Sequence, residues 1–112
     1  MRMWMINPTL LCRQHLLGEH HEIHKHRHVF VRKYSVAGRR GQIEPESMKM
    51  RHDELAHEMT RRGMNHNSEY TQPDLSYLPD EDRLGLADIE ASVKYLMDRC
   101  PDCAALIVEE LT

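Results

Sequence analysis

The stretch SMKMRHDELAHEMTRRG, residues 47–63, decides the fold of this chain. Its apolar side chains recur at steps of seven and four residues, which places them on one face of an α-helix: Met48, Leu55 and Met59. Ser47 is a suitable cap before the first turn, and Gly63 follows two arginines, which is typical of a helix C-terminus. The pattern predicts a helix over roughly residues 47–62 whose apolar face packs on a core.

Another helix is predicted on the N-terminal side. Pro8 suits a first helical turn. The residues that recur after it at three- and four-residue steps are Leu10, Leu11, Gln14, Leu17 and His21. These indicate a helix over residues 8–24. Residues 25–43 then alternate basic and apolar side chains, which predicts a basic loop that could follow phosphates.

The C-terminal half predicts a loop and two further helices. Residues 64–80 combine asparagine and proline with apolar side chains, which predicts a loop packed over the core through Leu75, Tyr77 and Leu78. A helix over residues 88–98 would bury Ile89, Val93 and Leu96, and a last helix over residues 102–111 follows Pro101. The fold predicted for residues 1–112 is all-α, a compact single domain of three to four helices with long irregular connections.

Charge is distributed unevenly along the 112 residues. Residues 1–62 hold twelve Lys and Arg against seven Asp and Glu, while residues 63–112 hold three against eleven, which together give the net charge of −3. The basic part could face phosphates while the acidic part stays away. Eight of the nine histidines also lie in the basic part, so its positive charge is expected to grow as pH falls through about 6.5.

Cysteine usage and hydropathy bear on the compartment. Three cysteines make an odd count, which fits a reducing interior better than a disulfide framework. No apolar run approaches the roughly 18 residues needed to span a bilayer, and no signal peptide is visible. We expect no membrane partner and a cytoplasmic location.

Three parts of the sequence resemble one known family. They are QHLLGEHHE, residues 14–22; RHDELAHEMTRRGMN, residues 51–65; and DLSYLP, residues 74–79, followed by EAS, residues 90–92. In this order they resemble the pyrimidine-dimer DNA glycosylases, the family of phage endonuclease V. The resemblance implies an all-α domain that binds damaged double-stranded DNA and pushes a base out of the stack.

The resemblance also implies the chemistry. It makes the N-terminal amine, here that of Met1, the nucleophile, and Glu22 the essential carboxylate. The amine attacks the sugar C1′ of a damaged pyrimidine nucleotide, the base leaves, and the imine permits β-elimination with Glu22 taking the C2′ proton. An α-amine suits this role because its pKa of about 7.7–8.0 leaves a neutral fraction near pH 7. Bulky Arg2 is expected to prevent removal of Met1, so that Met1 itself carries the amine. The activity that the resemblance implies is that of a DNA N-glycosylase and AP lyase.

Contacts to DNA follow from the same resemblance. The residues implied around the lesion and its phosphates are Arg2, Gln14, His15 and His21, and those implied on phosphates farther along are Lys25, Arg27, Arg32 and Lys33. His21 stands in place of an arginine and His52 in place of a glutamine, so contacts near the extruded base are expected to differ. The protein is expected to act as a monomer, associated with the nucleoid of a bacterial or phage-infected cell when bound to DNA.

Two patterns raise the question of a metal site. His20, His24 and His28 recur every four residues and would form a stripe able to hold a transition metal on a continuous helix. Cys100 and Cys103 have the CxxC spacing used for zinc or redox exchange, yet zinc would need two more ligands and only Cys12 remains among the cysteines. The favoured interpretation is a basic histidine-rich segment and a pair of semi-buried thiols beside a helix breaker, so neither metal nor cofactor is predicted.

Two alternatives stay open at this point. The chain could be a non-catalytic DNA-binding or regulatory module of the same fold, with Met1 buried or blocked. It could also apply the same chemistry to another damaged or modified base.

Overall fold

Helices are the regular elements of this fold. The structure is a computed structural model that describes residues 2–66 and 68–112, and these contain no strand. In chain order the elements are η1 (Pro8–Leu10), α1 (Arg13–Val31), η2 (Ala37–Arg39), η3 (Pro45–Ser47), α2 (Met48–Arg61), α3 (Asp80–Arg83), α4 (Ile89–Arg99) and α5 (Pro101–Leu111), where η marks a 3-10 helix. The predicted all-α class with long irregular connections is confirmed, with α1, α2, α4 and α5 as its main helices.

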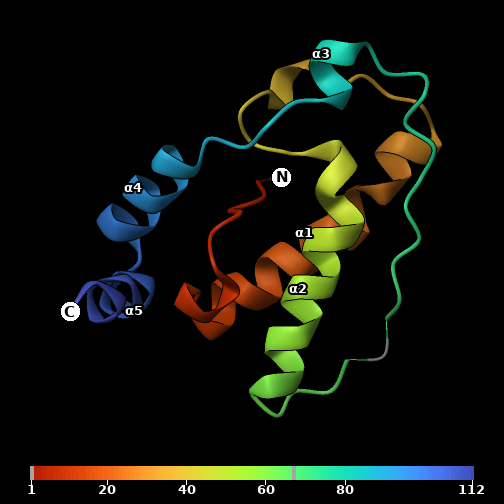
Figure 1. The fold of residues 1–112 in the computed structure, drawn as a ribbon. Helices are drawn as coiled ribbons and strands as arrows, with labels where there is room; N and C mark the ends of the chain where they lie inside the picture. The colour runs from red at the N-terminus through yellow and green to blue at the C-terminus, as the bar shows by residue number, and fades with distance from the viewer. Residues whose placement is uncertain (1, 67) are drawn as a thin grey trace.

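The two longest helices, α1 and α2, lie against each other and form the core (Figure 1). The apolar residues that α1 buries are seven residues, or two turns, apart: Leu16, Ile23 and Phe30. The predicted apolar face of α2 is confirmed, since Met48, Leu55 and Met59 are all buried. Ser47 forms no capping bond through its side chain and instead ends η3, whereas Gly63 stops the helix as predicted with a φ of 83°.

The bounds predicted for the first helix were wrong at both ends. Pro8 begins a separate 3-10 turn, and α1 starts only after Cys12, whose sulfur caps it. At the other end α1 continues to Val31, because Phe30 extends the two-turn apolar repeat. Residues 25–31, predicted as loop, are therefore helical. Histidine and basic residues separate the buried positions of α1, which weakens the apolar periodicity on which the prediction relied.

The connection after α2 packs over the core as predicted. Residues 68–79 run past one side of the α1–α2 pair toward α3 (Figure 1). Their buried side chains include Tyr70, Leu75 and Leu78. The single turn of α3 was not predicted; it is held to η3 by Arg83, which donates to Glu46 at 2.6 Å and to Asp80 at 2.7 Å.

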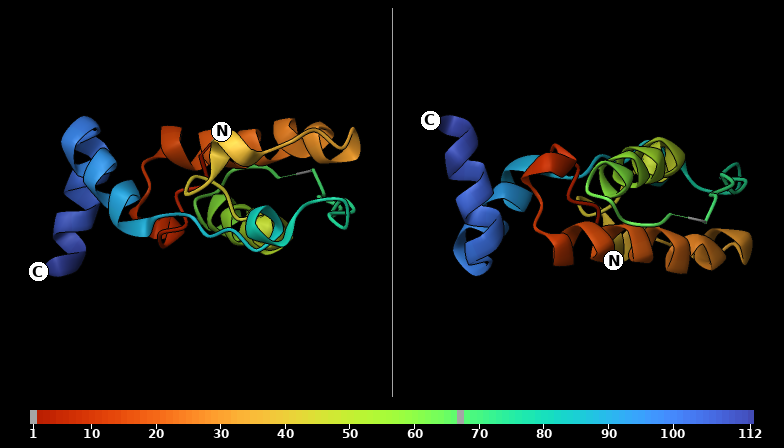
Figure 2. Two further views of the ribbon diagram at one scale, coloured as in Figure 1. Left: turned by 90° about the horizontal axis from the view of Figure 1, so that it is seen from above. Right: turned by 90° about the horizontal axis from the view of Figure 1, so that it is seen from below.

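The helices α4 and α5 form a hairpin beyond η1, at the end of the molecule away from the α1–α2 pair (Figures 1 and 2). Its side chains that join the core are Leu96, Cys103 and Ile107. Pro101 opens α5 directly, so the break between the two helices is a sharp turn at Cys100. The expectation for Ile89 was wrong, because half of this residue is exposed.

One set of buried apolar side chains connects the parts of this fold, from Met3 near the start to Ile107 near the end. The radius of gyration is 14.3 Å, close to the about 13 Å of a compact domain of this size. Within residues 2–66 and 68–112, no helix combines the length and the apolar character needed to cross a membrane.

Candidate active site

The segment that leads from the N-terminus is fixed to the core. Met3 is fully buried, and its N–H donates to Gln42 O at 2.7 Å. Trp4 and Ile6 are also buried, and Ile6 O accepts a hydrogen bond from Arg51 Nη1 at 2.7 Å. The path of the chain beside α1 is therefore set from Arg2 onward.

This segment and α1 together form a groove of about 320 Å³. Its lining residues are Arg2, Trp4, Gln14, His15, Gly18, Glu19, His21 and Glu22. The structure thus brings together the four residues that the family resemblance implied around the lesion, Arg2, Gln14, His15 and His21, and the implied catalytic carboxylate, Glu22. Met1, the predicted nucleophile, lies outside the described residues.

Arg2 is held beside the groove by aromatic side chains. Its guanidinium carbon lies 5.5 Å from the centre of the Trp4 ring and 5.7 Å from that of Tyr95 on α4. A guanidinium within about 6 Å of an aromatic face is stabilised by the ring quadrupole. Because Arg2 makes these contacts, α4 helps to set the position of the N-terminal segment.

The groove's two carboxylates differ in their surroundings. Glu19 is buried and accepts two hydrogen bonds from Arg51, at 2.6 and 2.8 Å, which neutralise it. The side chain of Glu22 is 35% exposed, and its ion-pair partner within residues 2–66 and 68–112 is His26, whose Nδ1 lies 3.4 Å away without hydrogen-bond geometry. Burial lowers the pKa of His26, so this ring is mostly neutral at neutral pH. Glu22 therefore remains available to accept a proton from a substrate.

Sequence reasoning missed the Glu19–Arg51 pair. Arg51 occupies the apolar face of α2 that Met48 and Leu55 define, and it is 1% exposed. A lone cation at such a position must find a buried partner, because an unpaired charge in the core is very costly. An arginine on the apolar face of a predicted helix is therefore the sequence feature from which a buried acidic partner could have been predicted. The pair fixes α2, α1 and the N-terminal segment together under the groove.

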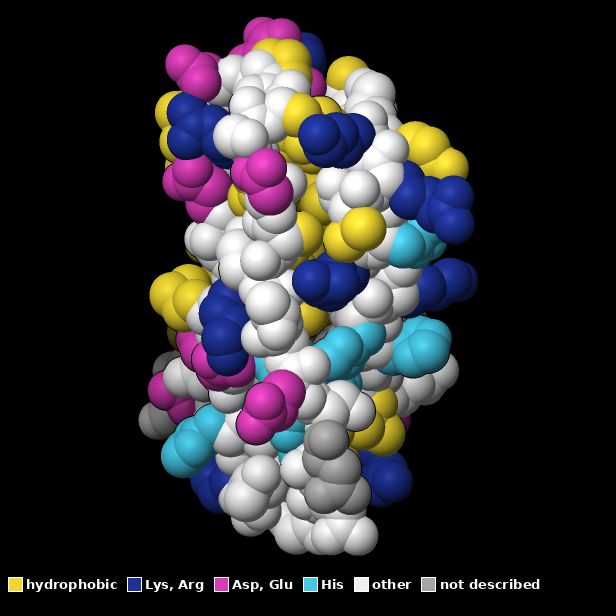
Figure 3. Space-filling view, turned by 90° about the vertical axis from the view of Figure 1, so that its right-hand side faces the viewer, with side chains coloured by type: hydrophobic (Ala, Val, Ile, Leu, Met, Phe, Trp, Pro, Cys, Tyr) yellow, Lys and Arg dark blue, Asp and Glu magenta, His cyan; other side chains and the backbone are white. Residues whose placement is uncertain are grey.

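The predicted phosphate contacts divide into free and engaged side chains. Lys25 is exposed in the second half of α1, and Arg32 and Lys33 are exposed just beyond its end. Arg27 is half-buried and donates from Nε to Thr71 O at 2.7 Å, which ties α1 to the loop. Figure 3 shows Asp and Glu side chains mostly along the left of the face it presents, while Lys, Arg and His side chains lie on both sides and predominate on the right, which makes the right side basic. The basic side offers the contacts that a DNA backbone needs.

A larger groove, of about 640 Å³, lies between η1 and α2. Its polar lining includes Asp53, Glu54 and Glu58. Asp53 is paired with Lys49, and Glu58 with Arg61 and Arg62, so Glu54 contributes most of the repulsion of phosphate there. The smaller groove beside Glu22 is the better candidate for binding DNA, because Arg2 lines it and it holds the residues that the family resemblance implied.

Four histidines meet between α1, α2 and the following loop, and we call them the histidine cluster: His20, His24, His52 and His66. The Nε2 atoms of His20 and His66 lie 2.8 Å apart, and those of His24 and His52 lie 3.0 Å apart. His28 does not belong to it, since its Nδ1 lies 2.6 Å from its own helix at Lys25 O. Of the three histidines that the sequence placed in one stripe, His20 and His24 belong to the cluster and His28 does not. His52, expected near the extruded base, is buried in this cluster rather than in the groove.

Two groups among the described residues have a donor set that could bind a metal ion. One is the histidine cluster. The other combines three sulfurs and an imidazole, and we call it the sulfur cluster: Cys12, His15, Cys100 and Cys103. The four donor atoms in each group lie within 4.8 Å of one another.

The histidine cluster should make the fold sensitive to mild acid. Burial, followed by the charges of His52, His24, His66 and His21, lowers the pKa of His20 to about 4. The unfolded chain takes up a proton below about 6.5 while the folded state does not, so this contribution to stability is complete above pH 6.5 and disappears as pH falls toward 4. We expect the free energy of unfolding, measured in urea, to fall between pH 6.5 and 5 by on the order of 1 kcal/mol, discounted for partial exposure.

A variant pair separates this effect from general acid denaturation. His20→Gln should flatten the dependence between pH 6.5 and 5, while His57→Gln, at an exposed position on α2, should leave it unchanged. An equal slope in His20→Gln and in the unaltered chain would contradict the assignment. The lowered pKa of His20 and His24 also corrects one expectation, because these rings add less positive charge for DNA binding near pH 6.5 than ordinary histidines would.

Comparison with known proteins identifies a family for this chain. A sequence model of one family, described as pyrimidine dimer DNA glycosylase, matches residues 1–72. This range contains the N-terminal segment, α1 and α2, and therefore the whole groove. No curated protein and no solved structure shows significant similarity to the chain. Since the match covers well over half of the 112 residues, the chain belongs to the pyrimidine dimer DNA glycosylase family, whose members act on DNA.

Proposed function

We propose that this protein removes a damaged pyrimidine from duplex DNA and then cuts the strand, with the α-amine of Met1 as nucleophile and Glu22 as proton acceptor. The observation that carries the proposal is the groove in which Arg2, the residue after Met1, lies with Glu22. The family of the chain supplies the substrate class. The pyrimidine dimer is the proposed lesion.

The Met1 amine and Glu22 would act in different steps of the reaction. The neutral amine attacks C1′, a new C–N bond forms, and the glycosidic bond breaks with its electron pair leaving on the base. The new ammonium then loses a proton, its nitrogen lone pair opens the sugar ring at O4′, and O4′ takes up a proton, which leaves a protonated imine at C1′. Because the imine acidifies C2′, Glu22 can take that proton, and the electrons released expel the 3′ phosphate.

The surroundings of the groove suit a DNA strand. The exposed cations at the end of α1 would hold phosphates, and extrusion of the base from the duplex would place C1′ within reach of the amine. Both reacting groups belong to one polypeptide, so we propose that a monomer is sufficient. We also propose a cytoplasmic location, where the substrate DNA lies.

Borohydride trapping tests the nucleophile. Incubation with ultraviolet-irradiated duplex in the presence of borohydride should give a covalent protein–DNA adduct, because reduction of the imine makes the link permanent. Intact-mass analysis should first show a free Met1, without formyl or acyl groups. Abasic and otherwise modified duplexes, tested in parallel, would identify the lesion.

The control is the same chain with its α-amine selectively acetylated. Acetylation should abolish the adduct but leave binding to undamaged duplex unchanged, since the phosphate contacts remain. Tight binding by the unblocked chain with no adduct on any duplex would overturn the lyase proposal and favour a non-catalytic DNA-binding module. Adduct formation on abasic DNA alone would remove the glycosylase step.

A further inference from the structure

We infer that the sulfur cluster is a structural zinc site that fastens the α4–α5 hairpin to the start of α1. Three cysteine sulfurs and one imidazole form a donor set that is typical of structural zinc. The residues come from opposite ends of the chain: Cys12 and His15 lie at the start of α1, and Cys100 and Cys103 at the start of α5.

Three of the six distances between donor atoms lie close to the edges of a tetrahedron around zinc, and all six are within 4.8 Å. Bonds of about 2.3 Å to sulfur and about 2.05 Å to nitrogen imply edges of about 3.8 Å between sulfurs and about 3.5 Å between sulfur and nitrogen. Cys12 Sγ lies 3.8 Å from Cys100 Sγ, and His15 Nδ1 lies 3.5 Å from Cys103 Sγ and 3.2 Å from Cys12 Sγ. All three cysteines are free thiols, and the separation of Cys12 and Cys100 far exceeds the about 2.05 Å of a disulfide.

The two pairs of ligands repeat one local geometry. Cys12 caps α1 and Cys100 caps α5, and in each case the capping sulfur accepts the N–H of the residue three positions later, at 3.5 and 3.4 Å. That later residue, His15 or Cys103, supplies the other donor of its pair. Both helix N-termini therefore point their partial positive charge at the cluster, where it would stabilise the negative charge of zinc-bound sulfurs.

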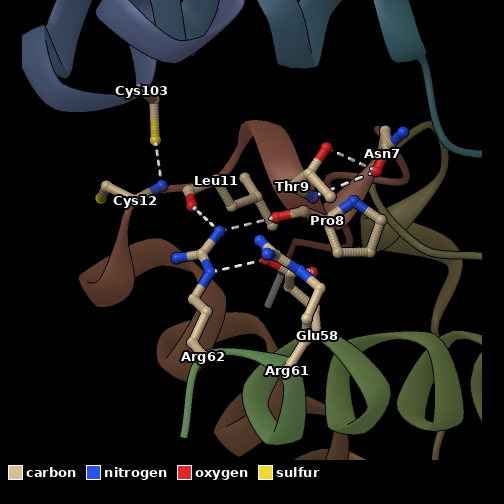
Figure 4. A network of polar contacts seen from close by, with 9 residues as sticks. All are labelled: Asn7, Pro8, Thr9, Leu11, Cys12, Glu58, Arg61, Arg62 and Cys103. Atoms are coloured by element: carbon tan, nitrogen blue, oxygen red, sulfur yellow. Dashed lines mark hydrogen bonds and ion pairs between the residues drawn. The ribbon is translucent and has the colours of Figure 1, made fainter.

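A backbone hydrogen bond also joins the two pairs of ligands. Cys12 N–H donates to Cys103 Sγ at 3.2 Å, from one helix start to the other (Figure 4). Hydrogen bonds from backbone N–H groups to metal-bound sulfur orient the ligands and disperse their charge. Cys12 and Cys103 are buried, so the site is closed, as structural zinc sites are.

The histidine cluster fits zinc less well. Its short nitrogen–nitrogen separations, 2.8 and 3.0 Å, are those of hydrogen bonds, whereas a tetrahedron of zinc-bound nitrogens has edges of about 3.3 Å. A metal ion in the sulfur cluster would also have a structural role. The family match ends at residue 72, so the hairpin lies outside it, and a metal at Cys100 and Cys103 would join that hairpin to the helix bearing Glu22.

Zinc content and cobalt spectroscopy of the full chain test this site. The protein purified without chelator should carry one zinc per chain, released when a mercurial reagent blocks the thiols. Cobalt added to the metal-free chain should give the absorption of tetrahedral cobalt with thiolate-to-cobalt charge transfer. Cys103→Ser should weaken zinc binding by more than about 100-fold, since even loss of an outer-shell partner costs 10–100-fold.

Matched variants distinguish the two clusters and guard against a misfolded variant. His15→Cys should keep one zinc through a fourth thiolate while His15→Ala loses it, and His66→Asn, in the histidine cluster, should keep it. Cobalt bound without the thiolate band, or zinc lost in His66→Asn but kept in Cys103→Ser, would overturn the assignment. So would a chain folded without metal whose three thiols all react freely. None of these measurements depends on glycosylase activity.

Discussion

Replacing Glu22 by Gln is expected to lower the rate of strand cleavage by about 10²- to 10⁴-fold, the usual contribution of a positioned general base. Glutamine keeps the size of the side chain but cannot take the C2′ proton. The second carboxylate of the groove cannot substitute, because Arg51 holds Glu19 with two hydrogen bonds in a buried position. Cleavage of irradiated and abasic duplexes under single-turnover conditions measures the effect.

Binding must be measured with the same variant, since loss of a negative charge beside DNA should tighten phosphate contacts slightly. Glu54→Gln is the matched control: it removes one exposed carboxylate from α2, in the acidic groove. This control should cleave at the rate of the unaltered chain. If Glu22→Gln cleaved as fast as Glu54→Gln, Glu22 could not be the base, and the mechanism would need another proton acceptor.

The sequence predicted those features that local patterns determine. The helix α2 was predicted closely because its apolar spacing, its Gly63 stop and its terminal arginines agree. The residues around the groove were placed through a family resemblance, and the structure brings Arg2, Gln14, His15, His21 and Glu22 together. The roles of these residues, and the nucleophile Met1, remain predictions.

Other features could not be predicted, because they depend on contacts between distant segments. Cys12 and Cys100 are separated by 88 positions along the chain, and only the packing of the α4–α5 hairpin on η1 brings their sulfurs to 3.8 Å. The CxxC spacing is visible in the sequence, but the sequence does not show that Cys12 and His15 lie beside Cys100 and Cys103. In the same way, the histidine cluster is completed by His52 and His66 from outside α1. The four-residue spacing in the sequence would have included His28 instead.

The other large effect concerns stability. Arg51→Met is expected to lower the free energy of unfolding by about 3–5 kcal/mol, because it leaves the Glu19 carboxylate buried and unpaired. It also removes the donor to Ile6 O, so a backbone carbonyl of the N-terminal segment loses its partner. Typical domains are stable by only about 5–15 kcal/mol, so the variant should unfold at much lower urea or temperature than the unaltered chain.

Two further variants show whether the lost pair, rather than the lost arginine, is responsible. Lys49→Met lies on the same helix and removes an exposed pair with Asp53, which should cost less than about 1 kcal/mol. The double variant Arg51→Met with Glu19→Leu removes both buried charges and should recover much of the stability, because well-packed apolar residues can replace a buried ion pair. If the double variant were no more stable than Arg51→Met, the cost would come from lost packing and the bond to Ile6 O rather than from an unpaired carboxylate. Recovery of stability without recovery of cleavage would show that the pair also holds the N-terminal segment in place beside Glu22.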